Sequence, residues 1–208
     1  MRGIAVDIDN VLSATNIFWA QELEKQFGNP EGLTPEQIWK KYVLTSNVPH
    51  WQTPEAKKWM DYARHSLEFQ ETIPLIENAN HVVNKIHEII PVVGYITARW
   101  EFIRETTESW LWKHDFPRAP VHMRPLGTED MHAMEWKASF LPTLYPEVAA
   151  HIDDDIHLLE YLPHDYKGTI FLYKHTKYPE TPVDVVVCEE WDTVLTEVSK
   201  RFGHYENQ

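Results

Sequence analysis

Gly3-Ile4-Ala5-Val6-Asp7-Ile8-Asp9-Asn10-Val11-Leu12 is the stretch of sequence that decides the fold. Its first residues are continuously apolar, which is typical of a strand buried on both faces of a parallel sheet. Residues two apart on a strand point to the same side, so Asp7 and Asp9 bring two carboxylates together where the strand ends. Such a pair repels unless a cation lies nearby, which predicts a divalent metal site. The alternative is a solvated Asp-x-Asp turn, and the motif alone does not decide between the two.

Apolar runs alternate with segments of helical spacing along the rest of the chain. This alternation predicts an α/β fold with a parallel sheet and helices on both faces, and such sheets carry their sites at the carboxyl ends of the strands. The expected strands are 92–96, 148–152, 169–173 and 183–187, with a weaker candidate at 120–123, and the expected helices are 76–90, 101–114, about 130–145, 155–162 and 189–202.

Residues 14–75 break the alternation because they contain no convincing strand. They are expected to form helices at about 14–28, 34–44 and 54–70, separated by proline and glycine. The segment is too long for a simple strand-to-helix connection. We therefore expect a helical cap at 14–75, inserted into a catalytic core made of 1–13 and 76–208.

Thr97 lies in Tyr95-Ile96-Thr97-Ala98-Arg99, after an apolar run and before a predicted helix. Its hydroxyl and the backbone N–H groups at the start of that helix are suited to bind a phosphoryl oxygen. The alternative is that Thr97 is a plain helix N-cap.

Lys137 and the acidic run Asp153-Asp154-Asp155 complete the set. Lys137 is expected on a helix, where a solvated surface charge is the alternative interpretation. Three adjacent carboxylates at the end of an apolar strand favour a cation, although Asp155 alone is explained as the cap of the next helix. The order Asp-x-Asp, Thr, Lys, Asp-Asp is more specific than any of its members.

Composition narrows the class of protein. The 208-residue chain has a formal net charge of −13, which argues against a partner held through a nucleic-acid backbone. The single cysteine, Cys188, excludes an internal disulfide and is expected to be a buried thiol. No apolar run approaches membrane-spanning length, so we expect a cytoplasmic protein without a membrane partner.

These motifs resemble those of the haloacid dehalogenase (HAD) superfamily of phosphatases over nearly the whole chain. Asp7-Ile8-Asp9-Asn10-Val11 resembles the first motif of that family, Thr97 the second, Lys137 the third, and Asp153-Asp154 the fourth. The resemblance implies a three-layer, Rossmann-like (HAD-type) fold, and the insertion at 14–75 resembles a C1-type cap.

Two groups within the superfamily look closest. The 5′(3′)-deoxyribonucleotidase-like group is similar in length, in cap position and in its Ile-Asp-Asp fourth motif. The phosphatase domain of polynucleotide kinases is similar at His122-Met123-Arg124-Pro125-Leu126-Gly127. Both groups usually have glycine where this chain has Asn10, which weakens assignment to either. Asparagine tolerates a positive φ better than most residues, so the turn is expected to be kept.

The resemblance also implies a mechanism. Asp7 would attack phosphorus and form an aspartyl-phosphate, while Asp9 would protonate the leaving oxygen and then activate water. Mg²⁺ would be held by the Asp7 carboxylate, the Asp9 backbone carbonyl and the Asp153-Asp154 pair, with Asp154 as the favoured direct ligand. Family members that hydrolyse phosphate esters carry an aspartate at the position of Asp9, which disfavours dehalogenase chemistry. The residues expected to bind the phosphoryl group are Thr97, Ala98 and Lys137.

The substrate is expected to be a nucleoside monophosphate or a similar small phosphorylated metabolite. The cap is rich in aromatic residues, which suit either a nucleobase or the cap's own core. The alternatives are a polynucleotide 3′-phosphatase and a non-catalytic phosphate-binding protein, and a homodimer is left open. The residues expected to contact the substrate are Phe18, Trp19, Arg99 and Arg124, and His122 and His151 are expected to support the site from behind.

Overall fold

The computed structural model describes residues 2–203. Six strands form one parallel sheet in the order β3-β2-β1-β4-β5-β6. Because β1 lies inside the sheet, its carboxyl end is flanked by those of β2 and β4, which confirms the predicted α/β class. The strands are β1 (Gly3–Val6), β2 (Val92–Trp100), β3 (Val121–Arg124), β4 (Val148–Asp153), β5 (Thr169–Tyr173) and β6 (Asp184–Cys188).

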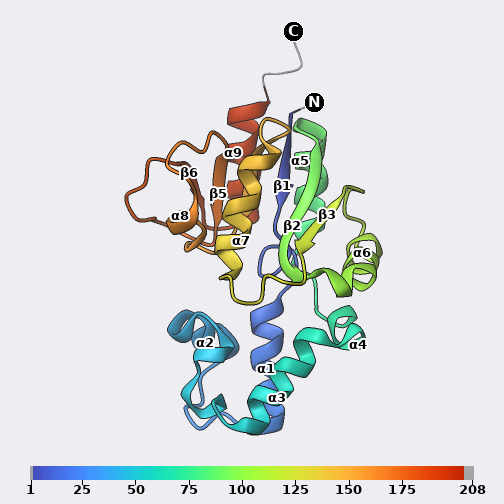
Figure 1. The fold of residues 1–208 in the computed structure, drawn as a ribbon, viewed down its shortest axis with the longest axis vertical. Coiled ribbons are helices and arrows are strands. Elements are labelled where there is room, and N and C mark those ends of the chain that lie inside the picture. Colours follow the sequence, from blue (N-terminus) through green and yellow to red (C-terminus); the bar gives the residue numbers. More distant parts are fainter. Residues whose placement is uncertain (1, 204–208) are drawn as a thin grey trace.

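Helices cover both faces of this sheet (Figure 1). Successive strand residues face opposite sides, so Ile4 and Val6 join one hydrophobic cluster and Ala5 joins the other. One face is covered by α5 (Ala79–Ile89), α6 (Arg104–Lys113) and α9 (Trp191–Phe202), and the other by α7 (Ala133–Phe140) and α8 (Leu158–Tyr161).

One boundary differs from the sequence prediction in a way that affects the site. Strand β2 continues to Trp100, four residues beyond the predicted 92–96, and a 3₁₀ helix at Glu101–Ile103 precedes α6. Thr97 therefore lies inside a strand and is not a helix N-cap, and no helix start lies beside it. The β2–β3 register shifts between Thr97 and Trp100, so the strand leaves regular pairing where it passes the site.

Residues 14–75, which we call the helical cap, form helices and turns. Three of the helices begin at polar caps: the side chains of Thr34, Thr53 and Ser66 each accept a hydrogen bond from a backbone N–H in the first turn. The elements are α1 (Thr15–Phe27), α2 (Pro35–Tyr42), 3₁₀ helices at Thr45–Asn47 and Pro49–Trp51, α3 (Pro54–His65) and α4 (Leu67–Glu71).

The cap joins the rest of the chain through two crossings that lie side by side. The Ala14 N–H donates to the Pro74 carbonyl and the Ile76 N–H donates to the Leu12 carbonyl, each at 2.8 Å. The cap buries its own apolar cluster, with Trp51 fully buried in it. In Figure 1 the cap lies beyond the end of the sheet where β1 runs into α1, so it covers the carboxyl ends of the strands.

Two further expectations concern chemistry away from the site. Cys188 is buried at the end of β6 and carries a free thiol. Within residues 2–203, no helix has both the length and the apolar character needed to cross a lipid bilayer.

Candidate active site

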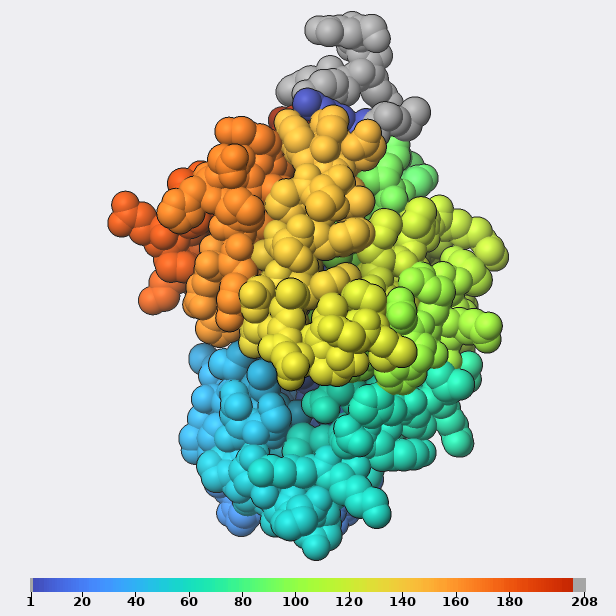
Figure 2. Space-filling view, viewed as in Figure 1, coloured from blue at the N-terminus to red at the C-terminus, as the bar shows by residue number. Residues whose placement is uncertain are grey.

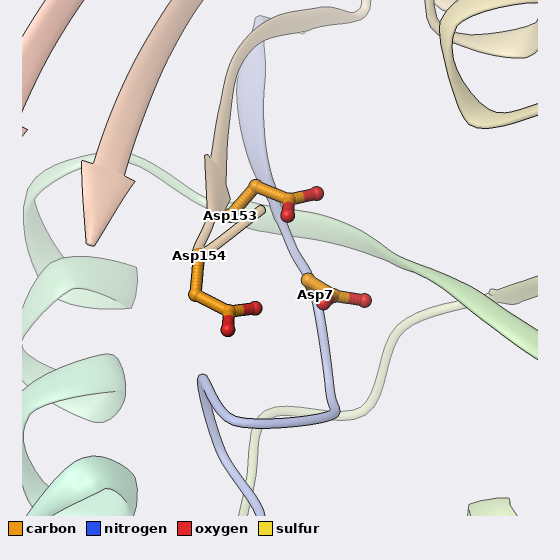
Figure 3. Close-up of side chains that lie close together, drawn as sticks. All are labelled: Asp7, Asp153 and Asp154. Atoms are coloured by element: carbon orange, nitrogen blue, oxygen red, sulfur yellow. The ribbon is translucent and has the colours of Figure 1, made fainter. Parts of the chain in front are cut away.

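Three carboxylates converge at the carboxyl end of the sheet. Asp7 follows the last residue of β1, Asp153 ends β4, and Asp154 is the next residue. One oxygen from each lies within 4.8 Å of the others (Figure 3). The carboxyl ends of the parallel strands thus bring together residues that are about 150 positions apart in the chain, as the sequence analysis predicts.

Lys137 reaches this cluster from α7. Its Nζ donates to Asp153 Oδ2 at 2.7 Å and lies 3.1 Å from Asp7 Oδ1. The side chain is 1% exposed, so the alternative of a solvated surface lysine is excluded. Burial alone would lower the pKa of Lys137, but the Asp153 and Asp7 carboxylates raise it well above its ordinary value, and the ammonium stays charged.

Asp153 is fully engaged by the protein. Its Oδ2 also accepts from Nε2 of the buried His151 at 2.9 Å, and its Oδ1 accepts from the Asp155 N–H at 2.9 Å. Burial opposes ionisation, yet Lys137 and His151 hold the pKa of Asp153 below its usual range. Burial lowers the pKa of His151, so its neutral ring donates through Nε2. His151 therefore supports the cluster from behind, as expected from the sequence.

Asp7 and Asp154 are unsatisfied by comparison. Asp7 Oδ1 is buried and, within residues 2–203, has the Lys137 ammonium at 3.1 Å as its one near partner. No side chain or backbone N–H of that range donates to the Asp154 carboxylate. Burial, together with repulsion from Asp153, raises the pKa of Asp7 to about 8. Burial and the Asp153 and Asp7 charges raise the pKa of Asp154 well above its ordinary value. This donor set fits a hard divalent cation, which would satisfy both groups.

Asp9 has a different partner. Its carboxylate is held by the Arg99 guanidinium, with Nη2 to Oδ1 at 2.8 Å and Nε to Oδ2 at 3.0 Å, and Thr15 Oγ1 donates to Oδ1 at 2.5 Å. Burial would raise the pKa of Asp9, but Arg99 and Thr15 lower it. Arg99, which the sequence analysis expects to contact substrate, pairs with Asp9 in this structure.

The turn after Asp9 keeps the expected conformation. Asn10 has φ 60°, the left-handed region that glycine favours, and its Oδ1 accepts from the Asn16 N–H at 2.9 Å. Two residues that the sequence analysis missed support the loop edge from the end of β5. Lys174 donates to the Asn10 carbonyl at 3.3 Å, and His175 Nε2 lies 2.9 Å from the Asp154 carbonyl oxygen. Both directly follow an apolar strand, so the strand-end rule was the signal that could have found them.

A cavity of about 340 Å³ opens over the carboxylates, and we call it the first cavity. Ala98 lines it, whereas Thr97 is fully buried and is not among its lining residues. The Thr97 hydroxyl accepts from the Arg99 N–H at 3.2 Å. The residues that line this cavity from the sheet side include Asp7, Asp9, Lys137, Asp154 and His175, and those from the cap include Asn16, Trp39, Lys40, Val43 and Leu44.

Of the residues predicted to contact substrate, Trp19, Arg99 and Arg124 line a cavity and Phe18 does not. Phe18 packs on Phe69 in the cap cluster, with ring centroids 5.3 Å apart, and lines neither the first cavity nor its neighbour. Trp19 lines the neighbouring cavity of about 310 Å³, which we call the second cavity, as do Arg99 and Arg124.

Arg124 also anchors the loop that follows β3. Its guanidinium donates to the Thr128 and Met131 carbonyls. His122, on edge strand β3, packs against Phe140 with ring centroids 5.1 Å apart, and it makes no hydrogen bond or ion pair with the described carboxylates. The expectation that His122 supports the site is therefore wrong.

Comparison with known proteins gives a fold. No family model matches the sequence, and no curated protein matches it. Solved structures do match in architecture. A dehalogenase with an intermediate complex is 11% identical, with a TM-score of 0.57 over 97% of each chain. A HAD family hydrolase from Deinococcus radiodurans R1, with bound phosphate and sodium, is 12% identical, with a TM-score of 0.57 over 96% of each chain.

A HAD-superfamily hydrolase of subfamily IA, variant 1, from Geobacter sulfurreducens PCA is 12% identical, with a TM-score of 0.52 over 95% of this chain and 99% of that one. Identities this low establish a shared fold and leave the reaction open, since both a dehalogenase and HAD hydrolases are among these structures. The fold implied by the resemblance is thus confirmed. The likeness to nucleotidases and to polynucleotide kinase phosphatases stays a prediction.

Proposed function

We propose that this protein is a HAD-type, Mg²⁺-dependent phosphomonoesterase that works through an aspartyl-phosphate on Asp7. The observation that carries the proposal is the state of Asp7. It is a buried carboxylate at a strand end and at the edge of a cavity, and its near partner within residues 2–203 is a buried lysine, 3.1 Å from Oδ1. A carboxylate in this position is placed to attack a phosphorus atom bound in the cavity.

The metal would be held by Asp7, Asp154 and the Asp9 backbone carbonyl. Asp153 is a poor direct ligand because Lys137, His151 and the Asp155 N–H already use its oxygens. Asp154 keeps its carboxylate free at the first cavity, which agrees with the choice made from the motif. When bound, Mg²⁺ supplies positive charge to the phosphoryl oxygens.

Two displacements at phosphorus follow. The Asp7 carboxylate forms a bond to phosphorus as the bond to the leaving oxygen breaks, and Asp9 gives its proton to that oxygen. Asp9 then takes a proton from water, whose oxygen displaces Asp7 and releases phosphate. Lys137 keeps a positive charge beside the transferring group, and the backbone at Ala98, which lines the first cavity, orients its oxygens. Thr97, fully buried and outside that lining, is left without a direct contact to the group.

The ion pair between Arg99 and Asp9 favours the role of Asp9 as the base that takes a proton from water. An Asp9 held ionised is ready to take a proton from water, but it is a weak acid catalyst for a departing alkoxide. We therefore expect leaving groups of low pKa to depend little on Asp9 in the first step.

We propose a small phosphorylated metabolite of the nucleoside monophosphate kind as substrate. Trp39, Val43 and Leu44 give the first cavity an apolar wall on its cap side, which suits an organic leaving group. A polynucleotide 3′-phosphatase is the weaker candidate, because the net charge is −13 and Arg124, which suggested it, is occupied with loop carbonyls. A non-catalytic phosphate-binding protein is the third candidate.

A phosphate-release assay tests the proposal. The purified protein is incubated with Mg²⁺ and p-nitrophenyl phosphate, mononucleotides, sugar phosphates and a 3′-phosphorylated oligonucleotide. We expect release that EDTA abolishes and that Asp7→Asn reduces by at least about a thousandfold, as for loss of a covalent nucleophile. Asp165→Asn, an exposed aspartate outside both cavities, is the matched control.

The other outcomes separate the alternatives. Preference for the oligonucleotide would favour the 3′-phosphatase. Calorimetric binding of phosphate with Mg²⁺ but without turnover would favour the binding protein. Halide release from 2-haloacids, with no phosphate release, would place the chain with the dehalogenases and overturn the proposal.

A further inference from the structure

The second cavity lies between the helical cap and the sheet, and Asp9 lines it whereas Asp7 does not. It shares four lining residues with the first cavity: Asp9, Asn16, Leu44 and Ala98. The two spaces therefore meet at the proposed acid–base residue. Figure 2 shows a seam on the surface between the cyan part of the cap and the yellow segment of the sheet domain.

The second cavity is lined by more positive than negative charge. Arg64 from α3, Arg99 from β2 and Arg124 from β3 line it, and its one carboxylate is Asp9, which Arg99 already pairs. The ion pairs of the other arginines in residues 2–203 are Arg104 with Glu108 and Arg201 with Asp184, so Arg64 and Arg124 have no carboxylate within 4.0 Å. Two guanidiniums without a carboxylate partner in one cavity are unexpected in a chain with a net charge of −13, although that of Arg124 donates to the Thr128 and Met131 carbonyls.

The remaining polar groups of the cavity are rich in donors. Trp19 Nε1 and Arg99 Nη1 are buried and have no hydrogen-bond partner within residues 2–203, and both residues line the cavity. Thr45 and Ser46 add hydroxyls from the cap. Because buried donors without acceptors are costly, the set is suited to a ligand that brings oxygen acceptors.

The aromatic residues of this cavity already have partners on their faces. The Arg124 guanidinium lies 4.4 Å from the centroid of Trp100, and that of Arg64 lies 5.6 Å from the centroid of Trp19. These rings hold the guanidiniums in place. The faces of the rings are therefore less available for stacking on a nucleobase. The acids nearest on the outer side, Asp61 and Glu129, line an adjoining cavity together with Arg64 and Arg124.

We propose that the second cavity binds a second anionic group, a phosphate or a carboxylate, carried by the leaving group of the substrate. This rests on the proposed function, since it takes the phosphoryl group to be at Asp7. The oxygen of the leaving group lies at Asp9, where the two cavities meet. The rest of the leaving group therefore extends beyond Asp9 into the second cavity. The substrate class is thus a phosphomonoester with a second negative charge. Arg64 binds that charge through charge-assisted hydrogen bonds, while Arg124, held by the Thr128 and Met131 carbonyls, adds positive charge to the cavity.

Matched substrate pairs test this. Phosphoglycolate is compared with 2-hydroxyethyl phosphate for the carboxylate, and a nucleoside 3′,5′-bisphosphate with its 5′-monophosphate for the phosphate. In at least one pair, we expect the member with the second anionic group to have at least about tenfold higher kcat/KM than the other member. Arg64→Gln is expected to lower this ratio of kcat/KM values by about tenfold, as one charge-assisted contact allows. Lys58→Gln removes an equal charge from the same helix outside the cavity, and is expected to leave the ratio unchanged.

Arg64 is exposed on the cap, so its replacement is not expected to unfold the protein. Equal kcat/KM for both members of both pairs, or an Arg64→Gln effect equal on both members, would overturn the subsite while leaving the phosphatase intact.

A binding measurement separates this result from failure of the proposed function. Calorimetry with Mg²⁺ compares Asp7→Asn with the Asp7→Asn/Arg64→Gln double variant, using the bisphosphate and phosphoglycolate as ligands. We expect Arg64→Gln to weaken the tighter of the two by about tenfold. This result does not require turnover, so it stands even if no substrate is hydrolysed. Absence of binding, or equal affinity in both variants, would overturn the subsite.

Discussion

At the carboxyl end of the sheet charged side chains are buried against one another, whereas the helical cap buries the rings of Trp19 and Trp51 and leaves charges such as Arg64 exposed. Lys137 and Asp153 are almost completely buried and in contact with each other. In the cap, Trp51 is fully buried and donates through Nε1 to the Gly28 carbonyl at 2.9 Å, while Arg64 stays at the surface.

This difference indicates a division of work. A buried charge network is rigid but costs stability, because each ion has left water. Such a cost is retained where the charges carry chemistry. The cap obtains its stability from aromatic packing, so the charges on its surface are free to select a substrate. The following predictions each change one side of this comparison.

Lys137→Met is expected to have the largest effect on stability. It leaves Asp7 and Asp153 as neighbouring buried carboxylates with no counter-charge, and we expect a loss of about 3–5 kcal/mol of unfolding free energy in EDTA at pH 8. Urea denaturation measures this. Lys85→Met, an exposed lysine on α5, is the control and is expected to change stability by less than about 0.5 kcal/mol. A loss of unfolding free energy below about 0.5 kcal/mol for Lys137→Met would contradict a buried charge network of Lys137, Asp7 and Asp153.

Trp51→Leu tests the other side. It removes a buried ring and leaves the Gly28 carbonyl without its donor, so we expect a loss of about 2–4 kcal/mol, measured in the same way. Because Trp51 lies in the cap cluster, the affinity for Mg²⁺, measured by calorimetry in the folded protein, is expected to stay within about threefold of wild type. A large loss of Mg²⁺ affinity would show that cap packing and the sheet end are not separate.

The pH dependence of stability gives a third test. The raised pKa of Asp7, about 8, means that the metal-free native state holds a proton that the unfolded state releases near its ordinary pKa. The stability that this proton contributes is present at low pH and is lost as pH rises toward 8, with a slope of up to about 1.4 kcal/mol per pH unit.

Mg²⁺ removes the need for that proton, so its stabilising effect is expected to grow from pH 6 to pH 8. Thermal unfolding with Mg²⁺ and with EDTA at each pH measures the difference. Asp7→Asn, which cannot titrate, should reduce the slope of the metal-free profile and leave the part that comes from the raised pKa of Asp154. A metal-free stability that rises with pH over this interval would contradict the assignment.

Val43→Gly is expected to have the smallest effect, and it stabilises. Val43 has φ 66°, a conformation that is strained for a β-branched residue, and its side chain is 54% exposed, so little packing is lost. We expect a gain of about 1 kcal/mol in unfolding free energy. Val43→Ala, which keeps most of the strain, is the matched control, and a gain of the same size there would contradict the explanation.

The sequence predicted the parts of the fold that depend on local pattern. Continuous apolar runs located five of the six strands, while β3, which contains His122, was only a weaker candidate. The rule that sites lie at strand ends brought Asp7 together with Asp153 and Asp154. The extension of β2 past Thr97 was missed because its last residues, Ala98 to Trp100, carry no apolar run. The Arg99 pair with Asp9 was missed for a different reason. It joins residues 90 positions apart through side-chain direction, which periodicity does not contain.

Covalent trapping of the intermediate tests the central claim most directly. Asp9→Asn slows the second displacement, so with p-nitrophenyl phosphate, whose leaving group needs no proton, an acyl phosphate should accumulate. Borohydride reduction followed by peptide mass spectrometry is predicted to find homoserine at position 7, only after exposure to substrate and Mg²⁺. Phosphate release without a modified position 7, or reduction at Asp154 instead, would contradict the assignment of Asp7 as the nucleophile.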